Sequence, residues 1–331
     1  MKTLVTGSTG FIGRHVVGQL VRSGASVRAL ERHPGPDGKG LVERIRGDVM
    51  DPSSISCAVD GCDTVYHLAA YAHAWAKSPS AFFDVNVGGT RCVLDAALRH
   101  GVRRVVVTSS VVTMGSANGQ PASESTPRHG PALTQYERSK VAEEETALEY
   151  SRRGLEVVIV NPTRVFGPGL LNEGNSATRM IRMYLDGLWR VLPGDGRAAG
   201  NYAYVGDVAR GHILAMAHGR SGERYILGGE NASYNEFFTM LGKIAGARRL
   251  LVHVPRAAAI AVAGAAVAGS RMTGTASPIT PGWVRMFYGN GSYCIEKAIA
   301  ELGYIVTPLP ETLEATVAWL RRGAPPDGEA V

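Results

Sequence analysis

A glycine-rich stretch near the start of the chain, Thr6-Gly7-Ser8-Thr9-Gly10-Phe11-Ile12-Gly13, decides the fold. It follows a short β-rich run, Thr3–Thr6, and opens a helical pattern, Ile12–Arg22. One glycine permits the tight turn, one lets the backbone approach a pyrophosphate, and one lets helix and strand pack closely. The N-terminus of the helix then offers free N–H groups to the phosphates. The spacing is GxxGxxG, one residue wider than the usual motif, but its place after a strand favours nucleotide binding over a plain glycine turn.

The same strand–helix alternation continues through about the first 160 residues. Near-continuous apolar strands that alternate with helices predict parallel strands covered on both faces. The fold class is therefore α/β, a doubly wound parallel (Rossmann) sheet whose ligand lies at the carboxyl ends of the strands. The further expected strands are Ser26–Leu30, Arg44–Arg46, Thr64–His67, Arg104–Thr108 and Glu156–Val160, and the further helical stretches are Pro79–His100 and Thr134–Arg153.

The pattern changes after Pro162, where glycine- and proline-rich turns appear. A helix is expected over Ser176–Leu188, and the chain then returns to the first domain through Tyr202–Val205 and the helix Val208–His218. We expect residues 1–163 plus about 200–228 to form the dinucleotide-binding domain. Residues from about 164–199 plus 229–323 form a smaller, mostly helical C-terminal substrate domain, and 324–331 are a tail.

Composition excludes several classes of protein. The chain has 331 residues, 45% hydrophobic and 19% charged, which is enough apolar material for a large core. No apolar run reaches the roughly 18 residues of a membrane span. The four cysteines form no CxxC pair, so neither a disulfide scaffold nor a metal site is expected.

The charge is 35 Lys+Arg against 29 Asp+Glu, or +6. The basic residues are scattered without interleaved aromatics, so we expect no nucleic-acid partner. The first residues run directly into a strand pattern without a signal peptide, which favours a cytoplasmic location.

The end of the second strand bears on the choice of cofactor. An acid there hydrogen-bonds the adenosine ribose hydroxyls, whereas an arginine accommodates a 2′-phosphate. The sequence has both, in Glu31-Arg32, with Lys39 close enough in sequence to join Arg32. Because Glu31 occupies the strand end itself, we favour NAD(H) over NADP(H). Asp48 follows the third strand and either caps the adenine pocket or is an ordinary turn residue.

A YxxxK pair, Tyr136 and Lys140, begins a helical stretch. Residues at i and i+4 share one helix face, so the phenol and the ammonium can point into one cleft. A phenol with a pKa near 10 exchanges protons poorly at pH 7, and a neighbouring cation favours the phenolate. Upstream, Thr108-Ser109-Ser110 ends a strand, where a serine hydroxyl can donate to a substrate carbonyl. These residues predict acid–base catalysis.

In these motifs the chain resembles the extended short-chain dehydrogenase/reductase family, also called the NAD-dependent epimerase/dehydratase family. The resemblance covers nearly the whole chain. It rests on Thr6–Gly13, His67-Leu68-Ala69-Ala70, Asn86-Val87-Gly88-Gly89-Thr90, Thr108-Ser109-Ser110, Tyr136/Lys140, Asn161–Gly169 and Tyr204–Ala209.

The resemblance implies a seven-stranded nucleotide domain, a nicotinamide cofactor, a Ser–Tyr–Lys mechanism and a homodimer. Alignment on Gly115 puts Ser110 rather than Ser109 at the catalytic position. The implied cofactor contacts are Gly7, Thr9, Gly10, Phe11, Ile12, Gly13, Glu31, Arg32, Asp48, Val49, Leu68, Ala69, Ala70, Tyr136, Lys140, Pro162 and Val165.

Within the family, the chain is similar to the dihydroflavonol-reductase and 3β-hydroxysteroid-dehydrogenase branch. Sugar-nucleotide epimerases usually carry Asn where this chain has Arg164, and Arg where it has Gly200. Both positions reach the nucleotide diphosphate in those enzymes, so their loss argues against a sugar-nucleotide substrate unless Arg164 or Arg197 substitutes.

Other candidate substrate residues are Tyr71, His73 and Trp75, which follow the fourth strand and could stack on a ring or simply pack the loop. The uncharged stretch Ala257–Gly269 is too short to span a bilayer. It can be a packed helix, a wall for an apolar substrate, or a membrane-surface contact.

Taken together, these features predict an NAD(P)(H)-dependent oxidoreductase that acts on a secondary alcohol or ketone of an apolar or polycyclic small molecule. Tyr136 would transfer the proton, and Ser110 would polarise the substrate oxygen. Lys140 would tune the pKa of Tyr136 and hold the nicotinamide ribose. One alternative is an NDP-sugar epimerase or dehydratase with tightly held NAD. The other is a non-catalytic nucleotide-binding regulator, against which the intact Tyr136/Lys140 pair argues.

Overall fold

The structure is a computed structural model of the chain. It describes residues 2–35, 40–73, 75–76, 78–115, 119–128, 130–275, 277 and 279–323. Lys39 and the expected tail, 324–331, lie outside the described residues.

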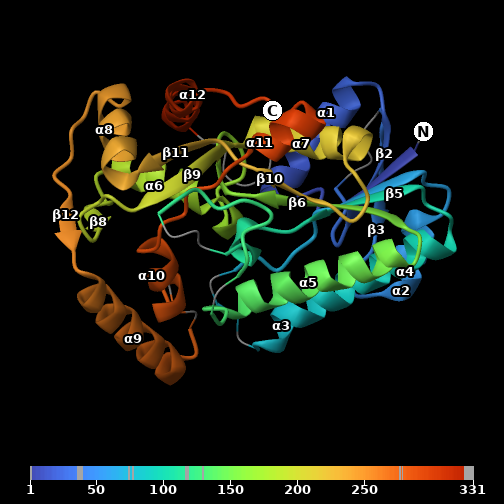
Figure 1. The fold of residues 1–331 in the computed structure, drawn as a ribbon, viewed down its shortest axis with the longest axis horizontal. Helices are drawn as coiled ribbons and strands as arrows, with labels where there is room; N and C mark the ends of the chain where they lie inside the picture. Colours follow the sequence, from blue (N-terminus) through green and yellow to red (C-terminus); the bar gives the residue numbers. More distant parts are fainter. Residues whose placement is uncertain are drawn as a thin grey trace.

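A seven-stranded parallel sheet forms the centre of the molecule (Figure 1), with strand order β10-β6-β5-β4-β1-β2-β3. The order reverses direction between β1 and β4, and ligands of open α/β sheets bind at the carboxyl ends of the strands beside such a point. The doubly wound parallel sheet expected from the sequence is therefore confirmed. Its strands are β1 (Lys2–Thr6), β2 (Ser26–Glu31), β3 (Val42–Arg46), β4 (Thr64–His67), β5 (Arg104–Thr108), β6 (Glu156–Pro162) and β10 (Arg224–Leu227).

Helices cover both faces of this sheet and bury one core on each side. On one face lie α1 (Phe11–Arg22), α7 (Val205–His218) and α11 (Glu296–Leu302), seen together at the upper right of Figure 1. The other face carries α2 (Pro52–Val59), α4 (Thr90–Arg99) and α5 (Gln135–Arg152). Helix α2 was not expected from the sequence.

The helix expected over Pro79–His100 is divided into three segments. These are α3 (Ser80–Phe83), a π-helical turn η1 (Asp84–Gly89) and α4. A π-helical turn holds one extra residue per turn and is frequent at functional sites. Here it lies beside α5, which carries the YxxxK pair.

A second group of elements packs around a third core rich in aromatic side chains. Its three-stranded sheet has the order β11-β9-β7, and β8 pairs with β12. The strands are β7 (Arg164–Phe166), β8 (Val191–Pro193), β9 (Ala199–Tyr204), β11 (Glu230–Ser233) and β12 (Val252–Val254). The helices packed around this core are α6 (Ser176–Leu185), α8 (Tyr234–Ile244), α10 (Pro281–Phe287) and α12 (Leu309–Arg321). Helix α9 (Arg256–Thr273) lies outside it, a 3₁₀ turn η3 (Glu173–Asn175) precedes α6, and another, η2 (Val111–Thr113), follows β5.

Helix α9 contains the uncharged stretch Ala257–Gly269 and projects from the body at the lower left of Figure 1. Only Ala263 and Ser270 of its residues are buried, so it is not a packed core helix. No helix of the described residues combines the length and the apolar character needed to cross a membrane.

Candidate functional site

The glycine loop leads from β1 into α1 with its backbone exposed to an incoming ligand. Gly7 has a φ of +68°, which L side chains rarely adopt, and a Cβ there would lie 2.6 Å from the Ala69 nitrogen. A Cβ on Gly13 would lie 2.0 Å from the Gly7 carbonyl oxygen. Gly10 is the N-cap of α1, and no side chain caps that end. The loop thus fits a pyrophosphate bound by backbone N–H groups.

The remaining residues expected around the cofactor surround this loop. Thr9 accepts a hydrogen bond from Arg14 through its carbonyl, while Phe11 is buried and Ile12 partly buried in α1. Leu68 donates its N–H to Thr6, which brings the segment after β4 against the loop. That segment, Leu68, Ala69 and Ala70, becomes progressively more exposed along its length.

At the end of β2 the structure separates the two candidate determinants of cofactor choice. Glu31 is buried, and its Oε1 lies 2.5 Å from Nη1 of Arg44 on the neighbouring β3. Arg32 is exposed. The sequence reading missed Arg44, because it belongs to another strand and meets Glu31 only when the strands pair. Asp48 accepts a hydrogen bond from the Met50 N–H, as turn residues do, and Val49 beside it is buried.

Tyr136 owes its position to the first turn of α5. A capping box joins Thr134 to Glu137, and Arg128 also binds the Glu137 carboxylate. This fixes the start of the helix and therefore the direction of the half-buried Tyr136 side chain. Ser110 and Lys140 both lie near its phenol, and both act to lower the pKa of that phenol.

The pKa of Tyr136 is raised, chiefly by burial, although Lys140 and Ser110 both act to lower it. The sequence had led us to expect a phenol shifted toward phenolate. Without the positive charge of an oxidised nicotinamide, the structure instead favours a protonated phenol at neutral pH.

Lys140 is completely enclosed, and its ammonium is held from two sides. Its Nζ donates to the Thr108 carbonyl at 2.9 Å and lies 2.6 Å from Oε2 of Glu143, which is equally buried. Burial would lower the pKa of Lys140, but Glu143 and Tyr136 outweigh it, so the pKa is raised. Burial raises the pKa of Glu143 to about 7, against the effect of Lys140.

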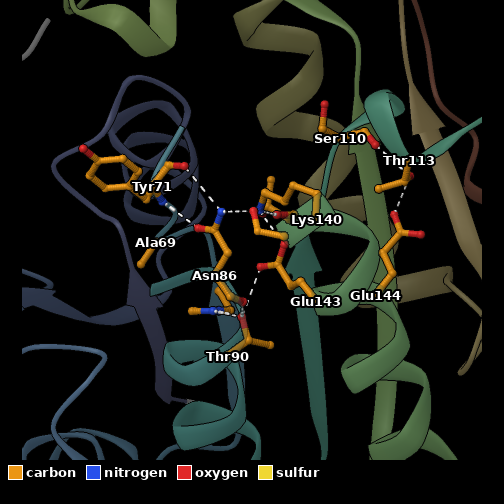
Figure 2. A network of polar contacts seen from close by, with 12 residues as sticks. Ala69, Tyr71, Asn86, Thr90, Ser110, Thr113, Lys140, Glu143 and Glu144 are labelled. Carbon is orange, nitrogen blue, oxygen red and sulfur yellow. Dashed lines mark hydrogen bonds and ion pairs between the residues drawn. The ribbon is translucent and has the colours of Figure 1, made fainter. Parts of the chain in front are cut away.

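A chain of polar contacts extends from this pair to the end of β1. Thr90 contacts Glu143 Oε1 at 3.1 Å, as Figure 2 shows. Thr90 also contacts His67 Nε2 at 2.9 Å, and His67 Nδ1 contacts Thr6 at 2.7 Å. Burial lowers the pKa of His67 to about 3, so its ring is neutral. The chain thus links the catalytic helix to the strand that carries the glycine loop.

Asn86 lies on the π-helical turn and bridges the site to the segment after β4. Figure 2 shows it between Tyr71 and the Lys140 side of the site. Its Oδ1 accepts the Tyr71 N–H at 2.7 Å, and its Nδ2 donates to Ser139 at 2.8 Å. Asn86 is fully buried and positions both neighbours.

A second polar cluster supports Ser110 from behind. Glu144 accepts hydrogen bonds from Thr113 at 2.8 Å and from Asn161 at 2.6 Å (Figure 2 shows the first). Asn161 also donates to the Ser110 carbonyl at 3.1 Å. These buried contacts hold the turn after β5, which carries the Ser110 hydroxyl.

The aromatic candidates after β4 are partly engaged with one another. The Tyr71 ring lies 4.4 Å from the His73 ring and 5.0 Å from Phe82, centroid to centroid. Trp75 is half-buried. Packing among these rings therefore accounts for Tyr71 and His73 at least in part.

Arg164 occupies a pocket of aromatic rings. Its guanidinium carbon lies 5.1–5.7 Å from the ring centres of Tyr202, Tyr234 and Phe287, and its Nη1 is buried without a hydrogen-bond partner. A Cβ on Gly200 would lie 2.5 Å from that Nη1, so the missing side chain at 200 makes room for this arginine.

Beside Arg164, the expected cofactor contacts Pro162 and Val165 are both buried, at the end of β6 and in β7. Arg197, the other candidate for a diphosphate contact, lies on the surface beside Asp195. The described residues hold no cluster of side chains that could bind a metal ion.

Comparison with known proteins agrees with this geometry. Residues 3–228 match the model of the NAD dependent epimerase/dehydratase family. A protein of Synechocystis sp. whose name refers to dihydroflavonol 4-reductase is 32% identical over 326 residues, covering 96% of this chain and 94% of that protein. The 3β-hydroxysteroid dehydrogenase/Δ5→4-isomerase of Mycobacterium tuberculosis is 33% identical over 226 residues, 66% of this chain and 60% of that protein. The family and the branch that the sequence indicated are confirmed.

A solved structure extends the comparison to ligands. MoeE5 in complex with UDP-glucuronic acid and NAD aligns with a TM-score of 0.76 and 29% identity, covering 97% of this chain and 99% of that one. The fold of this chain is thus shared both with proteins named for apolar substrates and with one that binds a sugar nucleotide.

Proposed function

Because the chain belongs to the NAD-dependent epimerase/dehydratase family, we propose that it interconverts a ketone and a secondary alcohol on an apolar or polycyclic small molecule. The observation that carries this proposal is that the Ser110 hydroxyl and the buried Lys140 ammonium both lie near the Tyr136 phenol and act on its pKa. Relatives named for dihydroflavonol and 3β-hydroxysteroid substrates support the substrate class.

Membership of this family makes the chain an enzyme whose cofactor is NAD(H) or NADP(H). The glycine loop and the uncapped end of α1 would hold the pyrophosphate, and Glu31 would hold the adenosine ribose. When bound, the nicotinamide supplies or accepts a hydride at its C4 atom.

The chain's own residues move the proton. In the reductive direction Tyr136 donates its phenol proton to the carbonyl oxygen, while the Ser110 hydroxyl hydrogen-bonds that oxygen. Because the pKa of Tyr136 is raised, the phenol carries this proton at neutral pH. Lys140, held by Glu143, stabilises the phenolate that remains and binds the nicotinamide ribose.

The test compares two tyrosines of α5. Tyr136→Phe removes the proton donor and should lower turnover of a steroid or flavanone ketone at least 100-fold, with cofactor binding kept. Tyr150→Phe is the matched control, because its hydroxyl bonds Asp95 at the far end of the same helix. NADH oxidation and NADH fluorescence measure the two properties. Near wild-type turnover by Tyr136→Phe would refute the proposed role of Tyr136 as proton donor.

A second candidate, an NDP-sugar epimerase or dehydratase, is favoured by Arg164. No carboxylate among the described residues pairs with this guanidinium, so an anionic group of a substrate could do so. Arg164 on β7 would then bind the substrate diphosphate, a contact that Gly200 on β9 cannot make because it has no side chain.

Titration of the cofactor complex separates the two candidates. A steroid or flavanone ketone should bind more tightly than UDP-glucose or a dTDP-hexose, as measured by heat or fluorescence. Micromolar binding of a nucleotide sugar that Arg164→Met abolishes, together with no binding of the ketones, would establish the second candidate instead.

A further inference from the structure

Helix α9 presents an apolar surface where a surface helix normally carries polar side chains. Ala263 and Ser270, seven residues apart, are its buried residues and mark one side of the helix. Its main packing partner is α10. Most of the other residues are exposed. Between Arg256 and Arg271 the exposed residues are Ala257, Ala258, Ala261, Val262, Gly264, Ala265, Ala268 and Gly269, and the exposed Met272 follows Arg271.

No charged, amide or hydroxyl side chain lies among the exposed residues between Arg256 and Arg271. A surface helix of a water-soluble domain usually alternates an apolar stripe with a polar one, and a helix that is apolar all round is normally covered. Val262 and Met272 are 66% and 89% exposed. Strand β12, which leads into α9, is preceded by Leu250, itself 81% exposed.

The charge of the chain is concentrated in the same segment. Between Phe237 and Ile295 there is no Asp or Glu. The basic residues of that segment are Lys243, Arg248, Arg249, Arg256, Arg271 and Arg285. Removing these six from the 35 basic residues leaves 29, equal to the 29 acidic residues. The remainder of the chain is therefore formally neutral, and the whole net charge of +6 belongs to this segment.

Three of these cations surround the apolar helix. Arg256 and Arg271 lie near its two ends, and Arg285 lies on α10 beside it. All three are exposed, and none takes part in an ion pair within the described part of the chain. Charges left free of partners in this way are available to an anionic surface.

We propose that α9 and the flanking arginines Arg256, Arg271 and Arg285, here called the α9 face, dock on a membrane that contains anionic lipid. The helix would lie in the plane of the headgroups with its apolar side toward the acyl chains. The arginines would bind lipid phosphates. A second copy of this chain fits poorly, because it would bring the same positive charge to the contact.

The α9 face is also connected to the candidate active site. Helix α10 packs between them: a Cβ on Gly282 would lie 2.5 Å from the Leu133 carbonyl, just before α5. At the other end of α10, Phe287 contacts Arg164. Docking through α9 would thus hold the site close to the bilayer, where an apolar substrate is concentrated.

Alanine and glycine bury little apolar area, so electrostatic attraction should dominate the binding. Each arginine near an anionic surface adds to this attraction, and salt screens it. We expect the protein to bind phosphatidylcholine vesicles that contain phosphatidylglycerol, and to bind pure phosphatidylcholine at least tenfold more weakly. Binding should also weaken at least tenfold between 50 mM and 500 mM salt.

Sedimentation with vesicles tests the proposal on the full chain. Arg256→Glu with Arg271→Glu, and separately Val262→Glu with Met272→Glu, should each raise the lipid concentration for half-maximal binding at least tenfold. Arg91→Glu with Arg152→Glu is the matched charge control, and Leu41→Glu with Ile305→Glu the matched apolar control, since all four residues are exposed elsewhere. Both controls should bind like the wild type.

Thermal melting confirms that each variant is folded, and ketone turnover without vesicles should be unchanged. Failure of the wild type to bind anionic vesicles would overturn the proposal, as would α9-face variants that bind like the controls. Light scattering without lipid tests the alternative that the α9 face binds a second copy of this chain. If the wild type is a dimer and the double variant Val262→Glu with Met272→Glu is a monomer, the α9 face binds a second copy of the chain instead of a membrane.

Discussion

Glu31 and Arg44 form the contact that should decide which cofactor the enzyme accepts. The carboxylate is buried at the end of β2, while the arginine is partly exposed beside it. While the pair is intact, the carboxylate can accept ribose hydroxyls and repel a 2′-phosphate, and it also neutralises the nearest cation. We therefore expect the wild type to prefer NAD(H).

Removing the carboxylate should reverse this preference. Glu31→Ala frees Arg44 to bind a 2′-phosphate, so kcat/KM for NADPH relative to NADH should rise at least tenfold. The double variant Glu31→Ala with Arg44→Ala should lose that gain, because no cation remains at the strand end. Steady-state kinetics with both cofactors measures the ratio. A wild type that already prefers NADPH would show that the Glu31 carboxylate does not face the ribose.

At the scale of elements, the junction of β1 and α1 depends on the absence of two side chains. A methyl group at Gly13 would collide with the Gly7 carbonyl, which is rigid backbone, so Gly13→Ala should displace the loop. We expect at least a tenfold loss in cofactor affinity and a lower melting temperature.

Gly18 in the same helix is the matched control. A Cβ there meets only the end of the flexible Arg22 side chain, at 3.3 Å. Alanine also favours a helix over glycine by about 1 kcal/mol, so Gly18→Ala should raise the melting temperature slightly. Calorimetry and fluorescence titration compare the two variants, and equal cofactor affinities would remove the steric role assigned to Gly13.

Six of the seven strands of the sheet were predicted from short β-rich runs between turn signals, whereas β10 (Arg224–Leu227) was not. Helix α2 was not predicted either, since its eight residues are rich in serine and gain their stability from packing against α4 rather than from helix propensity. The π-helical turn was also hidden, because Asp84–Gly89 continues an ordinary helical pattern in the sequence.

The candidate site was predictable where motif residues are close in sequence. Tyr136 and Lys140 are separated by one turn, whereas Arg44 reaches the site from β3 and Asn86 from the π-helical turn η1. Glu143 and Glu144 were missed for another reason. They begin a run of three glutamates, which in a sequence indicates a solvated helix face, yet both are buried by the polar groups that α5 meets.

For the whole molecule, two buried histidines should make stability depend on pH. Burial lowers the pKa of His67 to about 3 and that of His212 to about 4. In the unfolded chain these two histidines therefore bind protons near pH 6.5, whereas in the folded chain they stay neutral at that pH. Glu143, with its pKa near 7, acts in the opposite sense between pH 4.5 and 7. These three groups leave a net difference of about one proton, and His15, whose pKa burial also lowers, adds to it in the same sense. The free energy of unfolding should therefore fall by about 1.4 kcal/mol or more per pH unit as the pH falls from 6 to 4.5.

Urea unfolding at pH 8, 6 and 4.5 measures this slope. His212→Asn removes one titrating group, so the dependence of the unfolding free energy on pH should decrease by the contribution of about one proton. The asparagine amide can still donate to the Val208 carbonyl. A wild-type stability that is constant between pH 6 and 4.5 would contradict the assignment of neutral buried histidines.

The two edges of the central sheet also affect how readily copies of the protein aggregate through their edge strands. At one edge, β3 carries Glu43, Arg44 and Arg46, and Glu43 binds Lys2 at 2.6 Å. At the other, the Ile226 N–H of β10 is taken by the Glu124 side chain at 2.8 Å, and the Arg224 carbonyl by Lys297. Charges oppose the addition of a foreign strand at β3, and side chains already occupy the backbone groups of β10. Ordered strand-to-strand aggregation is thereby resisted at both edges of the central sheet.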